Sequence, residues 1–289
     1  MLGIVIAIMS AIFMTGMQIL LKKSYKELDP SVAFLFDMLF GLIIWIPVGF
    51  IFGATLSGII KCLIYAVISA VLSEALVFYA LSKGNLSVAT VLISTYPVYT
   101  LLFSLLINHE KLLPIQVVFI LITIIGTILT AFDSEFKIRN MKNISILIPF
   151  IAAVAIGLSD TLTKGIINST SSFDFIVAIA IVQIPVAIIY LLIAKQKIGT
   201  IIKELREGVK EYRFSVIGSL FNVLGTGCLL ISFNYTYASI ASPLTAIYTP
   251  FVLIYSFAKL KEKINKINLC GIVLALIGAF GIILVGELK

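Results

Sequence analysis

Long apolar runs alternate with short polar connectors along the whole chain. Charged residues, or clusters of Pro, Gly and Asn, mark the ends of each run. Because a helix that crosses a bilayer needs about 20 mostly apolar residues, each run is predicted to be a transmembrane helix. The ten predicted helices cover residues 2–21, 31–52, 62–82, 86–107, 113–132, 144–167, 173–194, 214–235, 239–258 and 267–286.

The longest connector, residues 195–213, has a different pattern. Ile201, Ile202, Leu205 and Val209 recur at helical spacing, and charged residues occupy the other faces. This pattern predicts a short amphipathic helix that lies in the membrane interface. The alternative is that the segment is a simple tether between two membrane helices.

The composition supports a membrane protein and leaves no room for a soluble domain. Of the 289 residues, 61% are hydrophobic and 12% are charged, whereas a soluble domain has about half apolar and about a quarter charged residues. The predicted fold class is therefore an all-α polytopic membrane protein. Neither a metal site nor a cofactor is expected, because Cys62, Cys228 and Cys270 are far apart and His109 is the only histidine.

The predicted helices fall into two sets of five that share matching features. Each half has a proline in its fourth helix, a glutamate in the following loop and a glycine inside its fifth helix; the pairs are Pro97 and Pro250, Glu110 and Glu262, and Gly126 and Gly278. Because five is an odd number, the second half must enter the membrane in the opposite sense. Two inverted repeats, residues 1–138 and 139–289, are thus predicted, as in many secondary transporters.

The distribution of the 21 Lys and Arg residues predicts the orientation in the membrane. All but four of them, Lys61, Lys111, Lys164 and Lys289, lie in the connectors that follow odd-numbered predicted helices. Cytoplasmic loops concentrate Lys and Arg, so both termini are predicted to lie outside the plasma or inner membrane. The same bias accounts for the net charge of +7 without a nucleic-acid partner.

Together these features resemble the drug/metabolite transporter superfamily, in its ten-helix EamA-type branch. The resemblance rests on the two halves, the Ala/Ser-rich stretches 85–89 and 238–242, the paired prolines and glutamates, and the helix glycines, Gly281 among them. It implies a central cavity between the first, third, fourth, sixth, eighth and ninth helices. Members of the family carry amino acids, sugars, nucleotide sugars, amines, drugs or choline-like compounds, so the resemblance leaves the substrate open.

Two features depart from the pattern of that family. Many members have an arginine early in the second helix, where this chain has Asp37. The better-known ten-helix members also keep their termini in the cytoplasm, whereas the lysine distribution here places them outside.

Three carboxylates lie more than one turn inside predicted membrane helices, where an ionisable residue costs about 2.5–3.5 kcal/mol on insertion scales and is by default a functional hypothesis. Glu74, in the third helix, is predicted to bind a proton or a substrate cation, with a hydrogen-bonded structural carboxyl as the alternative. Asp37 is a second candidate for that role, unless it pairs with an interfacial lysine or the backbone. Asp160 is four residues from Lys164 and is expected to form an ion pair with it. Gln18 aligns with Asp160 in the inverted repeat, so both are candidates to face the cavity.

Pro97 and Pro250 are predicted hinges, since a proline inside a helix removes a backbone hydrogen bond. Static kinks are the alternative. Tyr96, Tyr99 and Tyr248 lie beside these prolines. Their ring faces can hold a cation, although tyrosine is also common at membrane interfaces.

The remaining embedded groups bear on the charge of the substrate. Asn222, Thr226 and Thr245 are candidates for polar cavity lining, with interhelical hydrogen bonding as the alternative. Lys and Arg are missing from the middle of the predicted helices, which disfavours a sugar phosphate or nucleotide sugar, because a buried anion needs positive charge. The embedded acids instead favour an amine, a choline-like compound or an amino acid, or proton coupling with a neutral substrate.

The predicted function is a secondary active transporter that moves a small cationic or zwitterionic metabolite by alternating access, with Glu74 as the candidate to bind either a coupling proton or the substrate's cation. An exporter of neutral or hydrophobic drugs and a lipid flippase of the same fold are the alternatives. An enzyme is not expected, because the HExxH, GxSxG and GxGD patterns are missing, and no ring of pore-lining charge indicates a channel. The expected partners are a small-molecule substrate and the bilayer. Small residues on the tenth helix, Gly271, Ala275 and Ala279, would permit a homodimer as well as a monomer.

Overall fold

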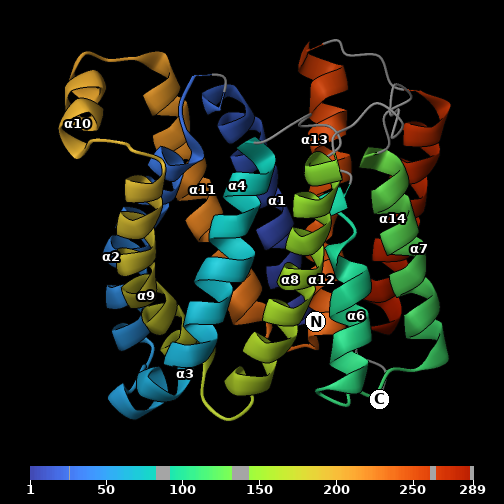
Figure 1. Ribbon diagram of the computed structural model, residues 1–289. Coiled ribbons are helices and arrows are strands. Elements are labelled where there is room, and N and C mark those ends of the chain that lie inside the picture. The colour runs from blue at the N-terminus through green and yellow to red at the C-terminus, as the bar shows by residue number, and fades with distance from the viewer. Residues whose placement is uncertain (26, 83–91, 132–142, 261–264, 287–289) are drawn as a thin grey trace.

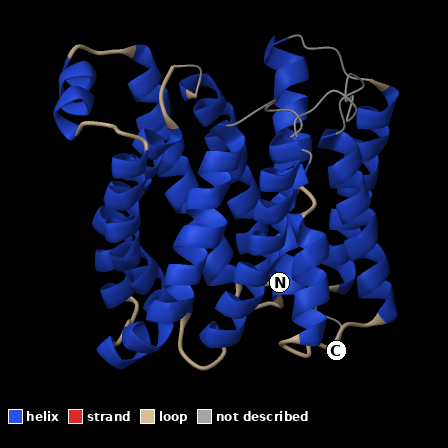
Figure 2. Cartoon of the chain, in the orientation of Figure 1, coloured by secondary structure: helices blue, strands red, loops and turns tan. Residues whose placement is uncertain are grey.

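The computed structural model describes residues 1–25, 27–82, 92–131, 143–260 and 265–286. Within these ranges every regular element is a helix (Figure 2), which confirms the predicted all-α class. Eight helical segments of the described residues are long and apolar enough to cross a membrane, two of them made of consecutive helical elements, and two shorter apolar helices accompany them.

The helices of the first half stand beside those of the second half (Figure 1). The described elements of the first half are α1 (Leu2–Ser24), α2 (Pro30–Ile51), α3 (Leu56–Ile68), the π-helix η1 (Ser69–Ala75), α4 (Leu76–Ser82), α6 (Tyr96–Leu106) and α7 (Pro114–Ala131). Those of the second half are α8 (Asn143–Ile167), α9 (Ser172–Ile193), α10 (Ile198–Arg206), α11 (Lys210–Ser232), α12 (Ala238–Ala246), α13 (Tyr248–Tyr255), the π-helix η3 (Ser256–Leu260) and α14 (Lys266–Val285).

The most extensive helix contacts join the two halves. Helix α1 lies along α11, α7 lies along α14, and α2 lies along α9. Helix α3 also contacts α9, and α11 also contacts α2. Within this frame α6 packs on α8, α8 packs on α3, η1 and α4, and α12 and α13 pack on α1.

Polar caps set the first residues of several helices. Asp29 accepts a hydrogen bond from the Ser31 backbone N–H (2.9 Å) ahead of α2. Thr55 accepts one from Gly58 N–H (3.1 Å), so α3 begins at Leu56 rather than at residue 62. Lys61, which suggested a helix end, is exposed on α3. A long lysine side chain can bury its stem and keep its amine in a polar region, so it does not have to end the helix.

The pair formed by α7 and α14 is close because glycines line it. A Cβ on Gly126 would meet the backbone of Ala275, and one on Gly271 would meet the backbone of Leu129 and Thr130. Ala275 and Ala279 are also buried. The small-residue face of the last helix is therefore covered by α7 of the same chain and is not available to a second copy while this pair stays packed.

The predicted amphipathic helix is α10, at the end of the bundle away from the labelled C-terminus (Figure 1). Ile201 is buried in a cluster with Tyr212 and residues of α2 and α9. Ile198, Ile202 and Leu205 are exposed. One face of α10 is thus docked on the bundle, and the exposed apolar side chains fit a helix that lies in the membrane interface.

Candidate functional site

A central cavity of about 140 Å³ lies between the two halves. Its lining comes from α1, η1, α4, α6, α8, α11, α12 and α13, which correspond to the helices that the sequence resemblance places around a cavity. Seven of the predicted residues line it: Glu74, Tyr96, Asp160, Asn222, Thr226, Thr245 and Tyr248.

The wall of the cavity combines apolar and acidic side chains. Met14, Met17 and Phe78 are among its apolar members. Among the described residues that line the cavity there is no Lys, Arg or His, so its ionisable groups are the carboxyls of Glu74 and Asp160 and the phenols of tyrosines. When its carboxyls are ionised, such a lining favours positive charge over negative charge.

Glu74 lies on the π-helix η1, which interrupts the predicted third helix. A π-helical turn adds a residue to the ordinary turn, and such turns occur often at functional sites. Ser69 and Ser73 from the same segment also line the cavity. The irregular turn thus concentrates three polar side chains on the cavity wall.

Asp37 does not line the cavity but is joined to it by amides. The Nδ2 of Asn222 donates to Asp37 Oδ1 (2.9 Å), and the Nε2 of Gln183 donates to Asp37 Oδ2 (3.3 Å). The same Gln183 Nε2 donates to Glu74 Oε2 at 2.6 Å. One amide on α9 therefore bridges a carboxyl of α2 and a carboxyl of η1.

The two bridged carboxyls are close enough to interact strongly. Because both oxygens bind one nitrogen, they lie within roughly 6 Å of each other, where two unit charges interact by about 3 kcal/mol at an effective dielectric constant of about 20. Neither Asp37 nor Glu74 makes an ion pair with a described residue. Their hydrogen bonds come from amides, which carry no compensating charge.

A second polar group surrounds Asp160 on α8. Ser242 Oγ donates to Asp160 Oδ2 (2.6 Å), and the Tyr96 hydroxyl donates to the Ser242 carbonyl (3.0 Å). The expected ion pair with Lys164 is not formed between these two described residues. Lys164 Nζ instead donates to the Phe233 carbonyl, because its side chain lies toward the end of the bundle, outside the cavity.

Both predicted hinge prolines stand at the start of a new helical piece. Helix α6 begins at Tyr96, so Pro97 lies in its first turn. Ile247 separates α12 from α13, and Pro250 lies in the first turn of α13. A first-turn proline costs no intrahelical hydrogen bond. The fourth and ninth predicted helices are therefore broken beside the cavity rather than kinked at the proline itself.

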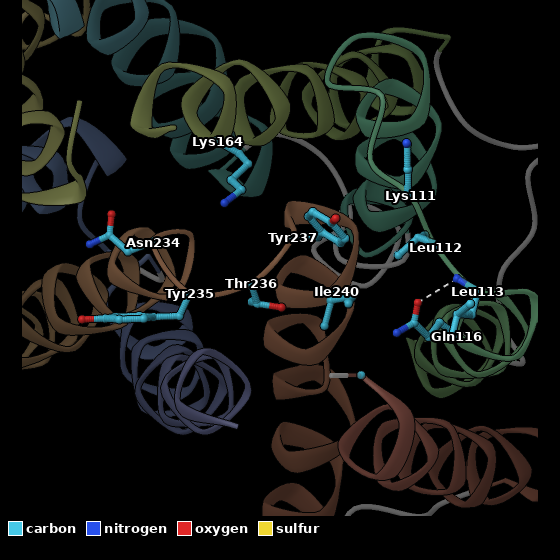
Figure 3. Close-up of a pocket in the computed structure, with 11 residues that line it drawn as sticks. Lys111, Leu112, Leu113, Gln116, Lys164, Asn234, Tyr235, Thr236, Tyr237 and Ile240 are labelled. Carbon is cyan, nitrogen blue, oxygen red and sulfur yellow. Dashed lines mark hydrogen bonds between the residues drawn. The ribbon is translucent and has the colours of Figure 1, made fainter. Parts of the chain in front are cut away.

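A wider hollow of about 650 Å³ opens at the end of the bundle where Gly286, near the C-terminus, lies. Figure 3 shows Lys164 from α8, Lys111 from the loop before α7, and the turn from Asn234 to Tyr237 around it. We call this hollow the vestibule.

Helices α8 and α12 contribute residues to both the vestibule and the cavity. On α12, Ile240 lines the vestibule and Thr245 lines the cavity. Glu110, which is 7% exposed, fixes the N-terminus of α12. Its carboxylate accepts hydrogen bonds from the backbone N–H of Ala238 (3.0 Å) and Ser239 (3.2 Å) and from the Ser239 hydroxyl. One carboxylate from the loop before α7 thus holds the start of α12, a helix that contributes to the walls of both hollows.

Comparison with known proteins shows the family to which this architecture belongs. The sequence model described as the EamA-like transporter family matches residues 1–132 and 143–284. The chain belongs to the EamA-like transporter family. Its membership confirms the resemblance drawn from the sequence and, with the apolar helices, indicates an integral, multi-pass membrane transporter. That the family consists of transporters also fits the expectation that the chain is not an enzyme.

Solved structures share the fold of this EamA-like chain. One crystal structure superposes with a TM-score of 0.77 over 98% of this chain and 96% of the other, at 14% sequence identity. Twenty-eight chains of solved structures match this chain. At such low identity the likeness concerns the fold alone. No curated protein matches the chain.

Three predicted residues of this EamA-like protein lie away from the cavity lining. Asp37 is linked to the cavity only by hydrogen bonds from the amides of Asn222 and Gln183. Gln18 is buried on α1. Tyr99 stacks edge-to-face on Phe150 of α8 at 6.0 Å between ring centroids. Glu262, the predicted counterpart of Glu110, lies outside the described residues.

Sequence reasoning missed Gln183, Ser242 and the role of Glu110. Gln183 is the only amide in its predicted helix, residues 173–194, which was a usable signal, because an unpaired amide in hydrocarbon is costly. Ser242 carried no such signal, since serine is common between membrane helices. The contact of Glu110 with α12 joins residues 128 apart in sequence, and no local pattern reveals it.

Proposed function

We propose that this EamA-like protein is a secondary transporter that moves a small cationic or zwitterionic metabolite through the central cavity. The observation that carries the proposal is the acidic cavity, which Glu74 and Asp160 line without a cationic side chain among the described residues. The substrate class is an amine, a choline-like compound or an amino acid.

The size of the cavity favours a small substrate. Its volume of about 140 Å³ is below the range of about 300–1,000 Å³ that is typical of pockets for drug-sized ligands. The rings of Tyr96 and Tyr248 line the same space and could receive a cation on their faces. Asp160, Thr245 and Asn222 supply polar contacts around it. Tyr99 and Gln18 stay predicted contacts that would require a different conformation.

We further propose that residues 1–138 and 139–289 are inverted repeats. The family match falls into two ranges of similar length. Helix contacts also recur between proposed counterparts. Helix α1 lies on α11, and α8, the counterpart of α1, lies on α3, η1 and α4, which are the counterpart of α11. Likewise α6 lies on α8, and α12 and α13, the counterpart of α6, lie on α1. This correspondence is what a pseudo-two-fold axis in the membrane plane would produce.

The proposed mechanism is alternating access. The halves would rock at the helix breaks before Pro97 and Pro250, and the vestibule would connect to the cavity when the start of α12 moves. The lysine distribution supports an orientation with the termini, and therefore the vestibule, outside the plasma or inner membrane.

Exchange across liposomes tests the substrate class without assuming any coupling ion. Purified protein is reconstituted, loaded in turn with choline, putrescine, L-lysine or the neutral polyol sorbitol, and assayed for uptake of the same radiolabelled compound. We expect at least one charged probe to exchange, and Asp160→Asn to slow the exchange at least tenfold. The matched control is Glu207→Gln, the same kind of neutralisation on the exposed helix end of α10. Exchange of sorbitol alone would instead support the neutral-substrate alternative and overturn the proposal.

A further inference from the structure

We propose that Asp37, Gln183 and Glu74 form one proton site, which holds a single exchangeable proton and releases it when a cation binds at Asp160. This inference rests on the proposed transport function and deepens it. It assigns the coupling ion, separates the coupling site from the substrate site, and gives Gln183 a positioning role.

The geometry of the site is that of two acids joined by one amide. Gln183 Nε2 directs hydrogen bonds to Glu74 Oε2 (2.6 Å) and Asp37 Oδ2 (3.3 Å). The three residues come from η1, α9 and α2, so the unit connects elements of both halves. The Gln183 carbonyl oxygen Oε1 is buried and has no hydrogen-bond partner. Gln183 therefore serves these acids only as a donor.

The surroundings of the pair leave it with one negative charge. The other titratable groups around it are acids or phenols: Tyr25 at the end of α1 interacts with Asp37, Tyr190 and Asp29 lie beyond Tyr25, and Asp160 lines the same cavity as Glu74. The rings of Tyr96 and Tyr248 complete the cavity wall. No described Lys, Arg or His balances two charges here, and two carboxyls in a shared site do not both ionise freely.

The two acids have unequal parts in holding that charge. Asp37 is 1% exposed and accepts from two amides, Asn222 and Gln183. Hydrogen bonds to a charged carboxylate favour the charged form, so Asp37 carries the negative charge. Glu74 accepts from one amide and lines the cavity. Glu74 therefore carries the proton, which it takes from and returns to cavity water.

Coupling follows because Glu74 and Asp160 line the same small space. A cation bound at Asp160 brings one positive charge into the cavity and stabilises the ionised form of Glu74, whose proton then leaves to water. When the cation leaves, Glu74 binds a proton again. One proton is thus exchanged for one cationic charge, and the net charge of the cavity is the same in both states.

Helix α2 leaves the space that the bridging amide needs. A Cβ on Gly41 would lie 2.9 Å from Gln183 Oε1, which is closer than a carbon and an oxygen can rest. We expect Gly41→Ala to displace the amide and weaken the bridge while both acids are retained.

Infrared spectroscopy tests the proton site without any substrate. The purified full-length protein is titrated with pH, and the carboxylic acid C=O stretch is followed. Every Asp and Glu of the chain contributes to this stretch, so the component of Glu74 is obtained as the difference between the wild type and Glu74→Gln. We expect this difference to contain one component that titrates, and that component to shift in frequency and midpoint in Gln183→Leu and Gly41→Ala. Glu207→Gln should leave it unchanged. Identical titrations of the wild type and Glu74→Gln would overturn the assignment of the proton to Glu74.

Transport assays then separate coupling from substrate binding. We expect Glu74→Gln to retain exchange of the active probe from the choline, putrescine and L-lysine series, but to lose at least tenfold in accumulation driven by a pH gradient. Glu74→Asp should restore part of it, which shows that a titratable group is needed. Gradient-driven accumulation by Glu74→Gln at the wild-type level would overturn the proposal. If no probe exchanges in the wild type, the proposed substrate class fails, and the infrared titration still decides the proton site.

Discussion

Glu110 offers the sharpest test of the proposed movement at the start of α12. Its carboxylate receives two backbone N–H groups and one hydroxyl at the start of α12. Ala238 and Ser239 are both 0% exposed, so water does not replace the carboxylate in this state. We expect Glu110→Ala to release the start of α12 and to open a path between the vestibule and the cavity.

The structure sets the magnitude of this effect. A hydrogen bond to a charged group contributes about 1.5–3 kcal/mol, and a buried donor left unsatisfied costs about 1–3 kcal/mol. With two buried N–H groups affected and partial rehydration from the vestibule, a loss of about 3 kcal/mol is reasonable. Because 1.4 kcal/mol is a factor of ten in an equilibrium constant, the open population should rise by about two orders of magnitude.

Cysteine labelling measures that population. In a background with Cys62, Cys228 and Cys270 replaced by alanine, Ser242→Cys is treated with a membrane-impermeant maleimide. We expect labelling to be slow with Glu110 present and at least tenfold faster with Glu110→Ala. Lys111→Ala, at the exposed neighbouring position, is the control and should change neither labelling nor thermal stability. Equal labelling rates with and without Glu110 would refute the role of this carboxylate as a lock.

Two further predictions concern packing and substrate affinity. Gly126→Ala places a methyl group against the backbone of Ala275, so thermal unfolding should show a loss of about 1–3 kcal/mol in the free energy of unfolding from overpacking. Gly199→Ala, which has open space around it, should show no such loss. Equal midpoints for both variants would contradict the close α7–α14 contact. Ser242→Ala removes the hydroxyl that donates to Asp160, so we expect the KM of the exchanged cation to change at least threefold. An unchanged KM would separate Ser242 from the substrate site.

The course of the helices was predictable because membrane insertion imposes a length and an apolar composition on each of them. Helix α9 covers Ser172–Ile193, against a prediction of 173–194. The start of α3 was less predictable, because an exposed lysine on a membrane helix looks like a boundary. The π-helix that carries Glu74 could not be predicted, since the sequence Ser69–Ala75 fits an ordinary α-helix equally well.

The candidate site was predictable in its chemistry but not in its connections. Glu74, Asp160 and Asn222 stood out as polar residues in apolar runs, and the structure brings them to one cavity. The predicted partner of Asp160, Lys164, was wrong, because a spacing of four residues allows an ion pair but does not require one. Lys164 donates to a backbone carbonyl instead. The bridge through Gln183 depends on helices that meet only in the folded chain.

Substrate protection of one cavity position tests the central claim that cations pass through this space. Thr226→Cys, which lines the cavity, is introduced into the cysteine-free background and treated with a cationic methanethiosulfonate reagent. Ile202→Cys, exposed on α10, is the control. The account predicts that labelling of Thr226→Cys abolishes exchange of the active cation and that the same cation slows the labelling, while labelled Ile202→Cys exchanges normally. Full exchange by protein labelled at Thr226→Cys would contradict it.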